Sequence, residues 1–184
     1  MPTWGWIAIV IGAAIVCGLV AWSLYRNRRR ARLQDTFGPE YDRTVADSPT
    51  RREAEAELAE REKRRGDYEI QPLEPQARER YAGQWRKTQE RFVDDPAAAV
   101  TDADRLIQEV MRERGYPVED FDQRAGDLSV DHPEVISNYR AAHGISIAND
   151  RGNASTEDLR NALVHYRALF SELLEVETAK AKQS

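Results

Sequence analysis

Cysteine is almost missing from this chain, since Cys17 is the only one in 184 residues. A single thiol cannot form a disulfide within the chain, and it cannot build a cysteine-based metal site. Disulfides and cysteine-bound metal ions, which often stabilise small secreted domains, are therefore excluded within one chain. This cysteine usage fits a reducing compartment.

Motifs of known catalytic chemistry are missing as well. The sequence has no Gly-rich phosphate loop, no Gly-x-Ser-x-Gly and no His-Glu-x-x-His. Its histidines, His132, His143 and His165, never stand three or four residues apart, so no two imidazoles share a helix face by spacing alone. We expect no cofactor, and no catalytic residue can be predicted from the sequence.

The acids between residues 120 and 131 are the best candidates for metal ligands. Asp120, Asp122 and Asp131 stand at positions 1, 3 and 12 of a calcium-loop pattern. Arg124 stands where position 5 needs an oxygen ligand, and Ala125 stands where position 6 needs glycine. We therefore expect no metal site.

Charged side chains are missing from the first 25 residues, and the stretch from Trp4 to Tyr25 is almost wholly apolar. A helix needs about 20 such residues to cross a hydrocarbon core about 30 Å thick. Amphipathic rings favour the headgroup layers. Such rings stand at both ends of the run: Trp4, Trp6, Trp22 and Tyr25. The sequence thus predicts a transmembrane helix, with the lipid bilayer as its partner.

Basic residues follow the apolar run at once. They form a basic collar made of Arg26, Arg28, Arg29, Arg30 and Arg32. Basic residues beside a span stay on the cytoplasmic side, so we expect the N-terminus outside and the rest of the chain cytoplasmic, at the cell (inner) membrane. A signal peptide would carry basic residues before its apolar run and end in a small-residue cleavage site. Neither is present, which favours an uncleaved anchor over residues 1–32.

Small residues recur four apart in the apolar run, as Ala8 with Gly12 and Ala14 with Gly18. This spacing lets two transmembrane helices approach closely and form a homo-oligomer. The alternative is that small residues are simply common in membrane helices. Both interpretations stay open.

The chain behind the collar is acidic. Residues 33–184 hold 22 of the 27 basic residues and all 32 acidic ones, a formal charge of −10. A surface with this balance repels phosphate backbones. We therefore expect no nucleic-acid partner.

Residues 33–74 are predicted to be a charged helical connector followed by a linker. Gly38-Pro39 breaks its first part, and Ser48-Pro49 resembles an N-cap followed by proline at the first helical position. Residues 50–65 are rich in Arg and Glu, with Leu58 as their only large apolar residue. So thin an apolar stripe predicts a mostly solvated stalk helix.

Helical periodicity recurs through residues 75–177, and no stretch alternates with the period of a strand. Asp95 and Ser155 are placed as N-caps. Gly115 and Gly144 are placed as helix ends. The predicted fold is all-α, with four helices in a small bundle behind the anchor and connector. We expect loops at residues 116–130, with room for one helical turn, and at residues 145–154, and a tail at residues 178–184.

Four segments resemble a recurring pattern in an uncharacterised family of bacterial single-pass membrane proteins. They are WRKTQERFVDDP at 85–96, ADRLIQEVMRERGYP at 103–117, DLSVDHPEV at 127–135 and HYRALFSELL at 165–174. The resemblance covers about two thirds of the chain. It implies a helical cytoplasmic domain behind a membrane anchor. The family has no established activity, so no catalytic residue is carried over.

These patterns favour a non-enzymatic adaptor or scaffold that is tethered to the membrane and binds a protein partner. Exposed aromatics such as Tyr116 and Tyr139 would supply the contact. The alternative is an enzyme whose site assembles from His132, His143 and nearby aspartates. Convergence of those groups in one concave site would separate the two hypotheses.

Overall fold

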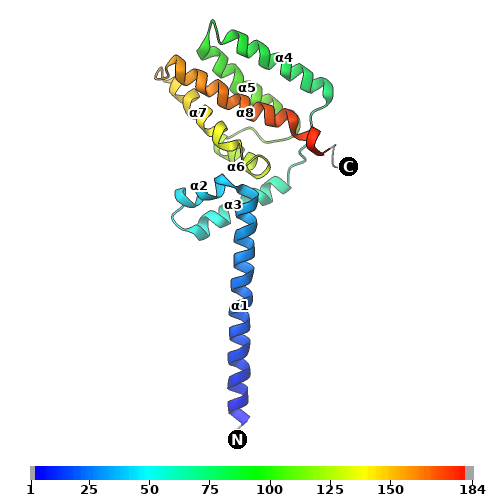
Figure 1. The fold of residues 1–184 in the computed structure, drawn as a ribbon, viewed down its shortest axis with the longest axis vertical. Helices are drawn as coiled ribbons and strands as arrows, with labels where there is room; N and C mark the ends of the chain where they lie inside the picture. The colour runs from blue at the N-terminus through cyan, green and yellow to red at the C-terminus, as the bar shows by residue number, and fades with distance from the viewer. Residues whose placement is uncertain (1–2, 181–184) are drawn as a thin grey trace. The chain divides into compact units, whose positions relative to one another are not determined.

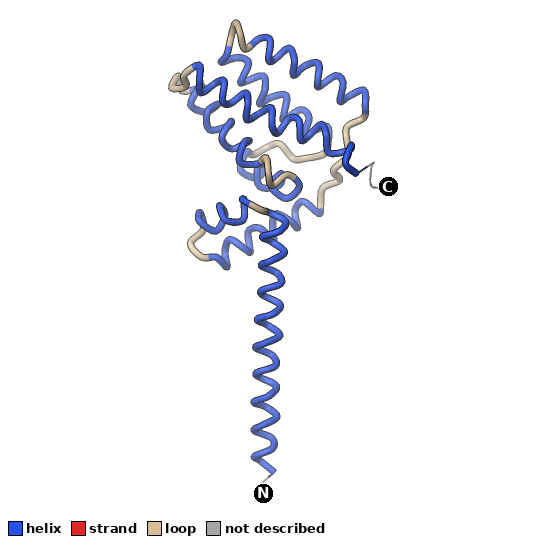
Figure 2. Tube along the Cα trace, in the orientation of Figure 1, coloured by secondary structure: helices blue, strands red, loops and turns tan. Residues whose placement is uncertain are grey.

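A computed structural model describes residues 3–180, with side chains described at residues 12 and 15–174. These residues form eight helices and no strand, which confirms the all-α prediction (Figure 1, Figure 2). The chain divides into two compact units, Met1–Leu58 and Ala59–Ser184.

The N-terminal unit begins with α1 (Thr3–Phe37), one uninterrupted helix of 35 residues. Gly38 then takes a positive φ of 46°, a conformation open to glycine, and α2 (Pro39–Asp47) starts directly behind it. The predicted break at Gly38-Pro39 is therefore confirmed. Proline suits the first turn of α2 because an N–H at that position would have no acceptor within the helix.

The predicted anchor lies in α1. The side chains of Trp4 and Trp6, and of Ala8 and Ala14, lie outside the described residues. Over the part of the chain that the structure describes, no helix combines the length and the apolar character needed to cross a membrane.

The third helix, α3 (Arg51–Gly66), starts two residues later than the sequence suggested. The Thr50 hydroxyl, and not Ser48, accepts a hydrogen bond from the Glu53 N–H at 3.3 Å. Ala54 and Leu58 have no exposed surface, whereas most other side chains of α3 are exposed or half-buried, as the thin apolar stripe predicts. One small and one large apolar residue, four apart, are enough to give the helix a buried stripe.

The C-terminal unit consists of the end of α3 and five further helices. They are α4 (Pro75–Arg91), α5 (Pro96–Arg114), α6 (Phe121–Asp131), α7 (Ile136–Asp150) and α8 (Thr156–Lys180). Helix α8 packs against α5 and α7, and α4 packs against α5 (Figure 1). The Trp85 ring of α4 stacks on the Phe170 ring of α8, with centroids 4.7 Å apart and planes inclined by 17°.

Three local signals in this unit act as the sequence predicted. The Asp95 carboxylate accepts from the Ala98 N–H at 3.1 Å and caps α5. Ser155 and Asp158 exchange hydrogen bonds, which is the reciprocal capping arrangement at the start of α8. Gly115 ends α5 with a φ of 95°.

Two expected loops are helical instead. Helix α6 occupies most of 116–130, and α7 continues through Gly144 to Asp150. Gly144 is exposed, and a Cβ there would meet nothing within 4 Å, so it is an ordinary helical position. The chain turns at Gly152, where φ is 71°, and the Asn153 N–H bonds back to the Ala148 carbonyl at 2.8 Å.

Candidate functional site

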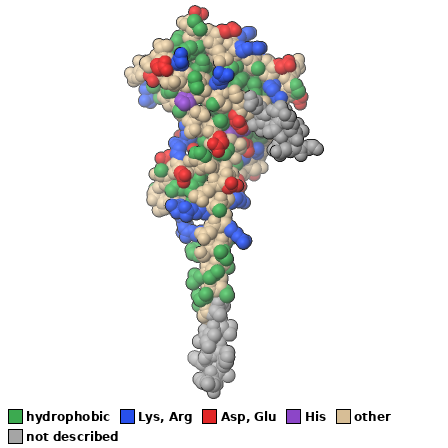
Figure 3. Space-filling view, viewed as in Figure 1, with side chains coloured by type: hydrophobic (Ala, Val, Ile, Leu, Met, Phe, Trp, Pro, Cys, Tyr) green, Lys and Arg blue, Asp and Glu red, His purple; other side chains and the backbone are tan. Residues whose placement is uncertain are grey.

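The exposed part of α1 is the most unusual surface of the N-terminal unit. Its large apolar side chains are between 53% and 67% exposed: Ile15, Val16, Leu19, Val20, Trp22, Leu24 and Tyr25. Consecutive residues of a helix point in all directions, so this segment is apolar on every side. Figure 3 shows these side chains in green around the helix, next to the blue atoms of basic residues. A surface of this kind requires an apolar environment or a partner.

The basic collar continues directly from this apolar surface. Arg26, Arg28, Arg29 and Arg32 are exposed, and Arg30 is half-buried. The guanidinium carbon of Arg26 lies 5.8 Å from the centroid of the Trp22 ring, within the range of a cation–π contact. That contact holds one arginine beside an aromatic ring at the end of the apolar run.

A groove of about 440 Å³ lies between α1 and the first turns of α3. Its α1 wall contains Trp22, Tyr25, Arg26 and Arg29. Tyr25, Arg26 and Arg29 follow Trp22 by three, four and seven positions, so each lies on the same face of the helix as Trp22. Its α3 wall contains Arg52, Glu55 and Ala56. We call this the arginine groove.

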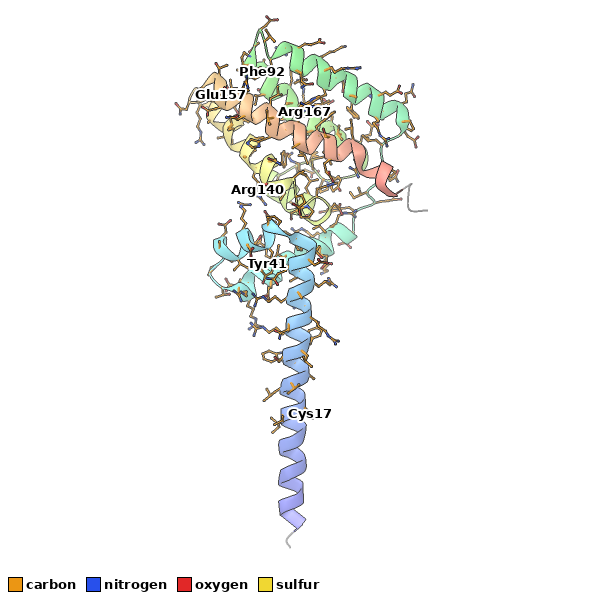
Figure 4. All side chains as sticks on the ribbon, viewed as in Figure 1. Cys17, Tyr41, Phe92, Arg140, Glu157 and Arg167 are labelled. Atoms are coloured by element: carbon orange, nitrogen blue, oxygen red, sulfur yellow. The ribbon has the colours of Figure 1, made fainter. Side chains whose placement is uncertain are left out.

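The carboxylate of Glu55 has a partner inside the protein. The Tyr41 hydroxyl of α2 donates to Glu55 Oε1 at 3.1 Å (Figure 4). Burial and the adjacent Glu55 carboxylate raise the pKa of Tyr41. The groove therefore carries three arginines and one partnered carboxylate, which leaves two excess positive charges.

Two aspartates of α6 hold the end of α3 in the C-terminal unit. Arg64 Nε lies 3.5 Å from Asp127 Oδ1, and the Tyr68 hydroxyl donates to Asp127 Oδ2 at 3.1 Å. One turn along α6, Asp131 Oδ2 accepts from Arg65 and from the Tyr116 hydroxyl, the latter at 2.5 Å. Burial and the Asp131 charge raise the pKa of Tyr116. These pairs fasten residues 64–68 to α6.

His132 is buried at the end of α6 and makes one contact with α8. Its Nδ1 lies 3.2 Å from Glu172 Oε1. Burial lowers the pKa of His132, although Glu172 acts in the opposite direction. On a neighbouring part of α8, Arg114 Nη1 donates to the Leu173 carbonyl at 2.9 Å. His132 is the C-cap of α6, with its N–H bonded to the Leu128 carbonyl.

The other two histidines lie in different surroundings. The His143 ring stacks on Phe121 with centroids 3.6 Å apart, and burial lowers the pKa of His143. His165 Nδ1 lies 2.8 Å from the Asn138 side-chain oxygen. Each of the three histidines thus has its own partner, and the convergence that an enzyme hypothesis requires is not observed within the described residues.

The acidic metal candidates are also explained by local structure. Asp120 is the N-cap of α6 and accepts from the Gln123 N–H at 2.9 Å. Asp131 is paired with Arg65 and Tyr116, and Asp122 is exposed. Within the described residues, no three His, Cys, Asp or Glu side chains are grouped as metal ligands would be.

Both aromatics that were expected to face a partner lie in the core. Tyr116 is 3% exposed and Tyr139 has no exposed surface, so that part of the adaptor hypothesis is wrong. Tyr139 instead tilts against Tyr166 and Phe121. The sequence could not separate surface aromatics from core ones here, because α6 and its packing against α7 were not predicted.

Sequence reasoning found the α1 wall of the arginine groove but missed the α3 wall. The spacing of Trp22, Arg26 and Arg29 already places them on one helix face. Arg52 and Glu55 join them only through the turn at Gly38 and the return of the chain along α3. No local pattern signals that approach.

The comparisons with known proteins give no family for this chain. No family model, no curated protein and no solved structure matches it.

Proposed function

We propose that this chain is a single-pass membrane protein whose helical C-terminal unit is held at the cytoplasmic face of the cell (inner) membrane, where it acts as an adaptor or scaffold. The observation that carries the proposal is the belt of exposed apolar side chains from Ile15 to Tyr25. Such a belt is stable in a hydrocarbon environment and is costly in water. The basic collar supports the orientation, because basic flanks are retained on the cytoplasmic side.

The proposed adaptor role is supported by the contacts that polar groups of the C-terminal unit make. Asp127, Asp131 and His132 are occupied by contacts that fasten helices to one another. In this proposal, these polar groups stabilise the packing of the helices, and the unit presents a rigid surface to a protein partner. A tether raises the local concentration of such a platform at the membrane, so weak protein contacts become effective there.

Carbonate extraction of membranes that contain the full chain tests the anchor. We expect the chain to stay in the pellet, and we expect the double substitution Val16→Glu and Leu19→Glu to release it. A charged residue at the centre of a span costs about 2.5–3.5 kcal/mol during insertion. The matched control is Val93→Glu with Val164→Glu, two exposed residues of the C-terminal unit, which should not change the pellet fraction. Release of the unmodified chain by carbonate would refute the anchor.

Two further measurements test orientation and the adaptor role. In intact cells, added protease should leave the C-terminus uncut, and digestion would refute the orientation. Affinity capture from solubilised membranes should recover a specific protein with the full chain but not with residues 1–32 alone. An identical set of proteins from both baits would refute the adaptor role.

A further inference from the structure

We infer that the arginine groove binds the phosphate of an anionic phospholipid headgroup. The inference rests on the proposed function, since it requires α1 to be in the bilayer. The inference assigns a binding site for anionic phospholipid to a part of the chain that the proposed function uses only as a tether.

The groove combines the two kinds of side chain that such a ligand needs. Arg26, Arg29 and Arg52 bring guanidinium groups to one concave surface from two helices. Guanidinium groups bind phosphate oxygens through charge-assisted, often bidentate hydrogen bonds. The contact of Arg26 with the Trp22 ring limits its freedom before any ligand arrives, which reduces the entropy lost on binding.

The position of the groove selects a lipid over a soluble phosphate compound. Trp22 and Tyr25 line the groove and also end the apolar belt of α1. Tryptophan and tyrosine rings settle at the headgroup level of a bilayer. A phosphate in the groove would therefore lie at the same depth as the phosphates of the surrounding lipids, with acyl chains beside Val20 and Leu24.

Size and charge limit which headgroup fits best. A groove of about 440 Å³ falls within the range of about 300–1,000 Å³ that is usual for small-molecule sites. Its two excess positive charges match a phosphate monoester, which carries about −1.5 to −2 at pH 7. Phosphatidic acid meets both conditions. Phosphatidylcholine does not, because its choline cation would face the arginines.

The test counts lipids retained by the full chain in neutral detergent, using native mass spectrometry during titration with phosphatidic acid or phosphatidylcholine. We expect saturable retention of one phosphatidic acid molecule and no saturable retention of phosphatidylcholine. The double substitution Arg29→Gln and Arg52→Gln should weaken phosphatidic acid binding by about thirtyfold, since both guanidinium groups contact the phosphate.

The matched control is Arg28→Gln with Arg51→Gln. These arginines are exposed, belong to the same two helices and do not line the groove, and the change in net charge is identical. The control should weaken binding by less than about twofold, because exposed charges outside the groove are screened. Far-UV circular dichroism of both variants should equal that of the parent chain, since all four side chains are at the surface.

Each other outcome has one meaning. Equal weakening by the two double substitutions would overturn the inference and leave only a non-specific attraction to the collar. Displacement of the lipid by inorganic phosphate at the same concentration would overturn the lipid assignment. Absence of saturable binding in a carbonate-resistant chain would overturn the groove alone, whereas release by carbonate would overturn the anchor and, with it, the groove.

Discussion

The Nε atom of Arg64 lies 3.5 Å from Oδ1 of Asp127, a carboxylate with no exposed surface. Arg64 itself is 41% exposed, so the pair joins a buried charge to one that still reaches solvent. This asymmetry means that the two partners do not contribute equally to stability.

Replacing Arg64 by Gln should therefore cost more than replacing Asp127 by Asn. Without Arg64, the buried carboxylate loses this cationic partner and keeps the Tyr68 hydroxyl, and we expect a loss of about 2–3 kcal/mol. Asp127→Asn removes the buried charge and keeps an acceptor for Tyr68, so about 1 kcal/mol is expected. Guanidinium chloride unfolding of the full chain in detergent, followed by far-UV circular dichroism, measures both.

Lys63→Gln is the control on the same helix. Its ammonium lies 3.9 Å from Glu60, and both side chains are well exposed, so we expect a change within about 0.5 kcal/mol. If Arg64→Gln changed stability no more than Lys63→Gln does, the Arg64–Asp127 pair would have no structural role.

Gly115→Ala should destabilise the C-terminal unit, whereas Gly144→Ala should not. A Cβ at Gly115 would lie 2.6 Å from the Glu69 carbonyl oxygen, at a φ of 95° that L side chains rarely adopt. We expect a loss of at least about 1–3 kcal/mol from this strain. At Gly144 the helix is open to solvent, and alanine should stabilise it by about 0.5–1 kcal/mol. Thermal unfolding of the two variants should thus shift in opposite directions, and shifts of the same sign would contradict this account.

Trp85→Ala should be among the most damaging substitutions in the C-terminal unit. The change removes a buried ring and its stacking on Phe170, and the expected cost is about 3–5 kcal/mol. Val93→Ala, at a side chain that is 83% exposed, should stay within about 0.5 kcal/mol. Chemical unfolding compares the two, and a cost below about 1 kcal/mol for Trp85→Ala would show that the stack is loose.

Stability should fall as the pH drops below 6.5, the ordinary pKa of histidine, because burial lowers the pKa of His132 in the folded chain. The unfolded chain then takes up a proton that native His132 does not, so the free energy of unfolding decreases until the pH reaches the lowered value. The charged groups around the imidazole are Glu172, Asp131 and Arg114. Unfolding measured between pH 7.5 and pH 5 should show a shallower loss for His132→Gln than for the parent chain.

His143 contributes in the same sense, since its pKa is also lowered by burial, and it is present in both proteins. His165→Gln removes a half-buried histidine of α8 and serves as the control. Identical pH profiles for the parent chain and His132→Gln would contradict the assignment of the effect to His132.

Local signals in the sequence predicted the start and end of several helices correctly. The N-caps at Asp95 and Ser155 and the left-handed end at Gly115 depend on residues within three or four positions of one another. Capping interactions between residues this close together can be predicted from the sequence alone. The same reasoning misplaced a helix end at Gly144, because glycine within a helix and glycine after one look alike without the backbone angles.

Helix α6 was missed because half of its buried residues are polar. Arg124, Asp127 and Ser129 are buried, and a periodicity based on apolar residues does not register them. Asp127 has partners from far along the chain, Arg64 and Tyr68. Arg124 and Ser129 donate instead to nearby carbonyls, those of Val118 and Gly126. The α3 wall of the arginine groove was missed because Arg52 and Glu55 approach α1 only through the fold of the chain.

Cys17 is the only thiol of the chain and is exposed on α1 (Figure 4). It precedes Tyr25 by eight residues, which corresponds to about 12 Å along the helix axis. A nitroxide attached there needs no mutagenesis, and its relative accessibility to oxygen and to a water-soluble nickel chelate reports immersion depth. In the proposed bilayer arrangement, Cys17 therefore supplies a native probe of immersion depth relative to Tyr25, whose ring is expected at the headgroup level.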